Sequence, residues 1–136
     1  MSTRAQIGIY KSSKKKISKP DVLLYKHSDG YPDGVIPIIE PFLKRFDAER
    51  GIADTEYCGA WLSHALVEES IENMKKWFPK KDGKSFLGHG ICKNFHEDIE
   101  YFYRVYPNTI EIYETKFDSN PESYILIKTI KLKEEA

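Results

Sequence analysis

The sequence has few cysteines and no excess of charge, and each shortage excludes a class of protein. Cys58 and Cys92 are its two cysteines, so a disulfide-rich scaffold is excluded, and a single bridge is not expected in a reducing compartment. Lysine plus arginine and aspartate plus glutamate each total 21, which leaves a formal net charge of zero. Duplex-binding domains usually carry a clear basic excess, because phosphate contacts supply much of their affinity. The charge balance therefore argues against a dedicated DNA-binding protein.

Long apolar runs are missing as well. No stretch approaches the roughly 18 consecutive apolar residues of a membrane-spanning helix. The opening MSTRAQIGIY lacks the hydrophobic segment of a signal peptide. We therefore expect a cytoplasmic protein with no membrane partner. The sequence also lacks a P-loop, a zinc ribbon and a catalytic-triad pattern, and no cofactor is predicted.

Apolar residues are nevertheless plentiful. Hydrophobic residues make up 40% of the chain and aromatic residues 13%, which is enough for a packed core without a disulfide or a metal. A chain of 136 residues is close to the commonest domain size. We therefore predict a single domain over residues 1–136.

Strands are predicted at both ends of the chain, where apolar residues alternate with polar ones. Ala5, Ile7 and Ile9 fall on one side of the first segment, which is typical of a strand with one buried face. The last segment contains the run YILI, which favours a central strand covered on both faces. The predicted strands are residues 4–10, 21–27, 85–93, 99–106, 109–116 and 123–133.

A first helix is predicted in the middle of the chain, where the apolar spacing changes to three and four residues. Pro37 and Pro41 both lack the N–H of a helix interior. We therefore expect a short irregular turn followed by a helix at about residues 40–50. Gly51 is the expected stop signal.

A second helix is predicted over about residues 54–78. Asp54 is a suitable N-cap, and Pro79 ends the pattern. The helix is expected to bury its aromatic side chains, Trp61 and Trp77 among them, and a break is allowed after the first half.

The predicted order of elements is β-β-α-α-β-β-β-β. Strands, then helices, then strands again are typical of an α+β domain. We expect an antiparallel or mixed sheet of about five to six strands, with both helices packed on one face.

The segment HSDGYPDG, residues 27–34, is dense in turn-forming residues and predicts a rigid corner. If a strand ends at His27, then His27 and Asp29 share one side of the chain. A carboxylate placed there would fix the tautomer of the imidazole and raise its basicity. Tyr31 would add a hydroxyl donor, so His27, Asp29 and Tyr31 are candidate catalytic residues. The structural alternative is that Asp29 caps a turn and His27 only binds a carbonyl group.

A second set of candidates lies in GHGICKNFHED. His89, Cys92 and His96 have donor atoms that suit zinc. The pattern lacks the second paired cluster of a structural zinc site. On a strand, His89 would share a face with Leu87 and Ile91, as an ordinary half-buried histidine does. Metal binding and a purely structural role therefore both stay open.

Residues 11–20 are polar and basic, and they predict a long, mobile loop between the first two strands. Lys14, Lys15 and Lys16 could contact phosphate there, which makes nucleic acid a candidate partner. A solvated loop is the more frequent explanation of such lysines.

Aromatic residues fill both faces of the strand predicted at residues 99–106. Tyr101, Phe102, Tyr103 and Tyr106 stand close together in the sequence. One face of this strand could present aromatic side chains to a protein partner or to a second copy of the chain.

Residues 2–37 carry a family resemblance. The opening STRAQIGIY and the segment LLYKHSDGYPDGVIP, with its Y-x-H-x-DGYP-x-G corner, resemble an uncharacterised family of small proteins in archaea, bacteria and their phages. The resemblance implies an association with phages or mobile elements, and it implies no activity.

Three functional hypotheses follow. The first, which we favour, is a binding or regulatory protein that engages a partner through the corner and an aromatic sheet face. The second is a small hydrolase, with or without a metal, that uses His27 as base or ligand and Asp29 to orient it. The third is a nucleic-acid-binding accessory protein that uses the lysine loop.

Overall fold

The computed structural model describes residues 3–77 and 88–133, which form an α+β domain around a mixed six-stranded sheet. Along the chain the elements are β1 (Ala5–Ile9), β2 (Val22–Lys26), α1 (Pro32–Glu49), α2 (Thr55–Trp77), β3 (His89–Ile91), β4 (Tyr101–Tyr106), β5 (Thr109–Glu114) and β6 (Ile125–Lys131). A short 3₁₀ turn precedes β6. The predicted fold class and order of elements are confirmed.

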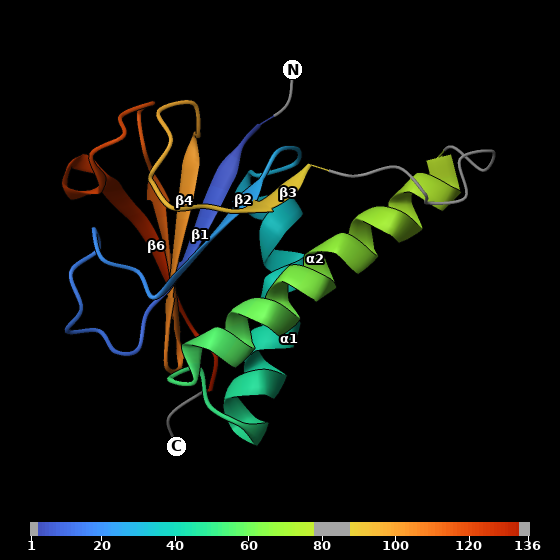
Figure 1. The fold of residues 1–136 in the computed structure, drawn as a ribbon, viewed down its shortest axis with the longest axis horizontal. Coiled ribbons are helices and arrows are strands. Elements are labelled where there is room, and N and C mark those ends of the chain that lie inside the picture. Colours follow the sequence, from blue (N-terminus) through green and yellow to red (C-terminus); the bar gives the residue numbers. More distant parts are fainter. Residues whose placement is uncertain (1–2, 78–87, 134–136) are drawn as a thin grey trace.

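The sheet has the strand order β3-β2-β1-β4-β5-β6. β1 and β4 run parallel, and the other neighbouring pairs are antiparallel. Figure 1 shows α1 and α2 on the same side of the sheet, as expected. Neither helix in the described ranges combines the length and the apolar composition that a membrane crossing requires.

β1 is buried on both faces, whereas the alternation indicated one. Ile7 packs in the core beneath the helices, and Gln6, on the opposite face, is also fully buried. The loop after β3 satisfies the Gln6 amide. Its Nε2 donates to the Asn94 carbonyl at 3.1 Å, and its Oε1 accepts from the His96 backbone N–H at 3.0 Å. A polar residue occupies the core here because a loop supplies its hydrogen-bond partners.

The face of the sheet away from the helices carries a smaller aromatic core. Tyr10, Phe102 and Tyr124 are its largest buried side chains. The basic loop of residues 11–21 covers part of this face. The Tyr10 hydroxyl donates to the Ile17 carbonyl, so the loop is tied to the sheet.

α1 begins at Pro32 and not near residue 40, so the predicted irregular turn is wrong. Pro37 and Pro41 lie inside the helix, both on its exposed side. The missing proline N–H groups cost stability, but Val35, Ile39 and Leu43 form a fully buried stripe at four-residue spacing. Burial of that stripe outweighs the loss of hydrogen bonds.

The end of α1 follows the sequence signals. Gly51 has a positive φ of 98°, and its N–H donates to the Phe46 carbonyl at 3.0 Å. This arrangement satisfies a terminal carbonyl and stops the helix. Asp54 lies just before α2, and its carbonyl accepts the Cys58 N–H at 3.0 Å.

Two predictions about burial are wrong. Trp61 and Trp77 are 56% and 69% exposed, because the buried stripe of the unbroken helix α2 consists of smaller residues such as Leu62 and Leu66. β6 lies at the edge of the sheet and is almost entirely exposed, so the YILI run does not mark a central strand. The predicted helix end at Pro79 and residues 85–87 of the predicted strand 85–93 lie outside the described residues, and the described part of that strand is the shorter β3, His89–Ile91.

Candidate functional site

The corner between β2 and α1 is held rigidly by its neighbours. Asp29 has a positive φ of 54°, which aspartate tolerates better than most residues. The Gly30 N–H donates to the Thr3 carbonyl at 2.8 Å, and the Tyr103 hydroxyl donates to the Gly30 carbonyl at 2.6 Å. A Cβ at Gly30 would lie 2.8 Å from the Ala5 Cβ. The position therefore has room for glycine alone.

The second half of the corner starts helix α1. Tyr31 precedes the helix in an extended conformation, and Pro32 stands in the first turn, where its missing N–H costs no hydrogen bond. A Cβ at Gly34 would lie 2.5 Å from the Asp29 carbonyl oxygen. The DGYPDG sequence therefore has a structural role: it reverses the direction of the chain in a small space and begins helix α1.

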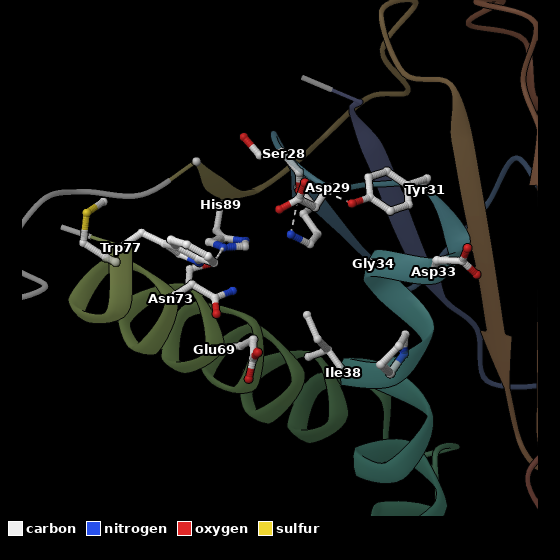
Figure 2. Close-up of a pocket in the computed structure, with 15 residues that line it drawn as sticks. Ser28, Asp29, Tyr31, Asp33, Gly34, Ile38, Glu69, Asn73, Trp77 and His89 are labelled. Atoms are coloured by element: carbon white, nitrogen blue, oxygen red, sulfur yellow. Dashed lines mark hydrogen bonds between the residues drawn. The ribbon is translucent and has the colours of Figure 1, made fainter. Parts of the chain in front are cut away.

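The corner forms one wall of a cleft with a volume of ≈ 520 Å³. Figure 2 shows Ser28 and Asp29 of the corner on one side, Glu69 and Asn73 of α2 on the other, and His89 of β3 beside Asn73. A cleft of this size suits a small organic ligand or a side chain of a partner.

Carboxylates outnumber cations around the cleft. Asp29, Asp33 and Glu69 line it, and all three are exposed. The cation among the lining residues is Lys26, so one positive and three negative charges give a formal charge of −2 with neutral histidine. The Tyr31 hydroxyl donates to Asp29 Oδ1 at 3.4 Å. The rim of the cleft is therefore acidic.

Lys26 is buried beside these carboxylates, with 5% of its surface exposed. Its ammonium group donates to the Ser28 carbonyl at 2.6 Å. Burial lowers the pKa of Lys26, while the charges of Asp29 and Glu69 oppose that shift. An ammonium group has three donor hydrogens, so Lys26 can serve both the Ser28 carbonyl and an acceptor oxygen of a ligand.

His89 and Ser70 form a pair within the cleft, with 2.6 Å between His89 Nε2 and Ser70 Oγ. Burial, together with the nearby charge of Lys26, lowers the pKa of His89 to about 4, so its imidazole is neutral at pH 7. His89 Nδ1 is buried and has no hydrogen-bond partner within the described part of the chain. The pair therefore resembles a serine–histidine dyad that lacks the third, orienting group.

The structure does not bring His27 and Asp29 together. His27 faces away from the cleft with Tyr25, because alternate residues of a strand point to opposite faces, and its Nδ1 lies 2.9 Å from the Tyr25 hydroxyl. Asp29 and Tyr31 both line the cleft. The candidate catalytic set from the sequence is thus divided between two faces of the sheet.

The three candidate metal ligands are also separated. His89 pairs with Ser70 on the helix side, and Cys92 packs against the aromatic core on the other face. The His96 ring contacts Tyr25 in a tilted arrangement, with centroids 5.1 Å apart. Within residues 3–77 and 88–133, no three histidine, cysteine, aspartate or glutamate side chains form a group that could hold a metal ion.

The predicted partner surfaces are less open than expected. Lys15 forms an ion pair with Asp21 at 3.0 Å, which leaves Lys14 and Lys16 as exposed lysines of that run. Phe102 and Tyr103 are fully buried, because β4 lies in the middle of the sheet. That strand therefore presents no continuous aromatic face.

Sequence reasoning missed four polar residues of the cleft, namely Lys26, Glu69, Ser70 and Asn73. One signal was available. Lys26 follows Leu24 at period two, so a lysine falls on the core-facing side of an apolar strand. The three residues of α2 form part of an ordinary polar helix surface, and nothing in their spacing distinguishes them.

Comparisons of the chain with protein-family models, with curated proteins and with solved structures gave no match. The interpretation of the cleft therefore depends on its own chemistry.

Proposed function

We propose that this protein is a binding protein, and that its cleft receives a positively charged group, such as the amine or guanidinium of a small molecule or of a partner's side chain. The observation that carries the proposal is the imbalance of charge around a cleft of ≈ 520 Å³, whose lining includes the carboxylates of Asp29, Asp33 and Glu69 and one buried lysine, Lys26. A concave site lined by one sign of charge concentrates ions of the opposite sign.

Aromatic side chains at the same rim support a cationic ligand with an apolar body. Trp77 and Tyr31 both line the cleft and are 69% and 42% exposed. An ammonium group over an exposed aromatic ring gains about 0.5–1 kcal/mol. Ile38 and Met74 add apolar surface between the polar groups.

The polar interior of the cleft would fix the orientation of such a ligand. Lys26 offers donor hydrogens, and His89 is a neutral imidazole held by Ser70. A ligand with an acceptor oxygen at one end and a cationic group at the other would match Lys26 in the interior and the carboxylates at the rim.

The pair of Ser70 and His89 favours a second candidate function, a serine hydrolase. In that reaction Ser70 Oγ would attack a carbonyl carbon while His89 Nε2 takes the hydroxyl proton. This candidate ranks second, because a histidine with a pKa of about 4 is a weak base and its Nδ1 has no partner among the described residues. Labelling by a fluorophosphonate that disappears in Ser70→Ala would favour the hydrolase over the binding protein.

The cellular setting is part of the same proposal. We place the protein in the cytoplasm, in association with a phage or mobile element. The supports are the resemblance of residues 2–37 and the free thiols of Cys58 and Cys92. A regulatory role through a bound partner or metabolite is consistent with such a setting.

A matched pair of probes tests the proposal. 2-Phenylethylamine and 3-phenylpropionate share an aromatic body and carry opposite charges. Calorimetric titration of each therefore shows whether the cleft prefers a positive or a negative ligand. We expect the amine to bind and the carboxylate not to bind. The double variant Asp33→Asn/Glu69→Gln should weaken the amine at least about fivefold.

Glu97→Gln is the control, because Glu97 is an exposed carboxylate outside the cleft lining. Equal affinity of the protein for the two probes would contradict a charge-selective cleft. So would an equal loss of affinity for 2-phenylethylamine in the control and in the double variant.

A further inference from the structure

β6 is the edge strand farthest from the cleft. Within the described ranges it pairs with β5 and with no other strand. The outer edge of such a strand directs unpaired N–H and C=O groups toward solvent, which is a template for another extended chain. The opposite edge, β3, has three residues, whereas β6 has seven.

The side chains of β6 divide into an apolar and a basic half. Ile125, Leu126 and Ile127 are 50%, 48% and 45% exposed. The basic half contains Lys128 and Lys131, and no acidic residue lies between positions 124 and 133. A β-bulge in β6 lies where the two halves meet, opposite Ile112 and Tyr113 of β5.

Neighbouring carboxylates do not cancel this positive charge. Glu111 of β5 is bound by Arg104 at 3.0 Å, and Glu114 is bound by Lys116 at 2.9 Å. Within β5 and β6, lysine is therefore in excess over unpaired carboxylate.

A second copy of the chain is a poor occupant of this edge. Lys128 is the midpoint of β6, so antiparallel self-pairing centred on the strand would set it opposite the same lysine of the other copy. Like charges directly opposite one another destabilise a strand pair. Lysines on an edge are a common protection against self-association, yet they leave the edge open to a strand of opposite charge.

We propose that the outer edge of β6 binds an extended acidic segment of another protein, which adds a seventh strand to the sheet. In the antiparallel orientation, the first half of that segment would bring carboxylates to Lys131 and Lys128. Its second half would cover the apolar side chains of Ile125 and Ile127. Backbone hydrogen bonds would supply affinity, and the charge pattern would supply selectivity. This surface is separate from the cleft and does not depend on its function.

Three synthetic peptides test the proposal by fluorescence anisotropy. The first, Glu-Thr-Thr-Glu-Val-Thr-Val, matches the pattern; the second replaces both glutamates by lysine; the third keeps the first sequence with alternate backbone amides N-methylated. We expect saturable binding of the first peptide, and binding at least about tenfold weaker for each of the other two.

The variant Lys128→Glu/Lys131→Glu changes exposed side chains only and should fold normally. It should reverse the order of the first two peptides, while the affinity for 2-phenylethylamine stays unchanged. Equal binding of the N-methylated peptide would show that no strand is added. Failure of the first peptide to bind would also overturn the proposal.

Discussion

The two faces of the sheet hold polar clusters that differ in how their charges are satisfied. On the face away from the helices, Arg104 and Glu111 form an ion pair at 3.0 Å, and each side chain is 13% exposed. Arg104 also donates to the Lys15 carbonyl at 2.6 Å, and the Tyr113 hydroxyl donates to Glu111 at 2.7 Å. In this ion pair, Nε of Arg104 is the atom without a partner in the described part of the chain.

The cleft on the helix side is the opposite case. Asp33 and Glu69 make no hydrogen bond or ion pair within residues 3–77 and 88–133, and Nδ1 of His89 has no partner there. A polar network that is closed on itself holds a loop and a sheet together. Charges that stay open toward a cleft are available to a ligand. We therefore assign stability to the first cluster and recognition to the second.

The largest expected effect is the loss of the closed network. Glu111→Gln should lower the free energy of unfolding by about 2–4 kcal/mol, because the Arg104 guanidinium would stay buried without its counter-charge. Urea unfolding followed by circular dichroism measures the loss. Glu114→Gln is the matched control, since its partner Lys116 is on the surface, and it should cost less than about 0.5 kcal/mol. Similar losses in the two variants would remove the distinction between the clusters.

The corner that shapes the cleft should be nearly as sensitive. Gly30→Ala should cost about 1–3 kcal/mol, because its Cβ would collide with the chain at Ala5. Gly90→Ala is the control, since the nearest atom to its Cβ, on Tyr25, is 3.9 Å away. Thermal unfolding of both variants gives the comparison. If Gly30→Ala left the thermal stability unchanged, the corner would not be rigid.

His89 should make stability depend on pH. Its folded pKa of about 4 lies below the unfolded value of 6.5, so between these values the unfolded state binds the extra proton. Stability should therefore fall as the pH decreases from 6.5 to 4, by about 1–2 kcal/mol once partial exposure of the ring is considered.

His89→Asn should lack this part of the pH dependence. His64→Gln should keep it, because His64 is on the surface with a 63% exposed side chain. Chemical unfolding at a series of pH values compares the three proteins. Parallel curves for the unaltered protein and His89→Asn would show that the histidine is not held neutral.

The smallest expected change in stability belongs to the open carboxylates. Asp33→Asn should alter the free energy of unfolding by less than about 0.5 kcal/mol, because the substitution removes only the charge of an exposed side chain that has no partner among the described residues. The same variant should weaken binding of 2-phenylethylamine. A clear loss of stability would place Asp33 in a structural network and would contradict its availability to ligands.

Much of the fold could be predicted from the sequence because its signals are local. Alternation, helical spacing and a glycine stop depend on neighbouring residues, and they placed the hairpin, the end of α1 and the start of α2 correctly. The errors arose where tertiary contacts decided the outcome. α1 starts early because a buried stripe compensates for two prolines, and β6 is exposed because the order of strands puts it at an edge.

The candidate site was predicted only in part for the same reason. The corner lines a cleft, yet its histidine faces the other side of the sheet and the histidine of the cleft comes from β3. Ser70 and His89 are 19 residues apart in the chain. Proximity between a helix and an edge strand is a property of the topology, and no local pattern encodes it.

The central claim is that the open carboxylates form a cation-selective site, and residue-resolved NMR tests it most directly. In a titration of ¹⁵N-labelled protein with 2-phenylethylamine, we predict amide shifts at Asp29, Asn73 and Gly88 and none near Arg104. 3-Phenylpropionate should produce no such shifts. If the carboxylate probe moves the same amides, or if the amine moves only amides on the opposite face, the assignment of recognition to the cleft is wrong.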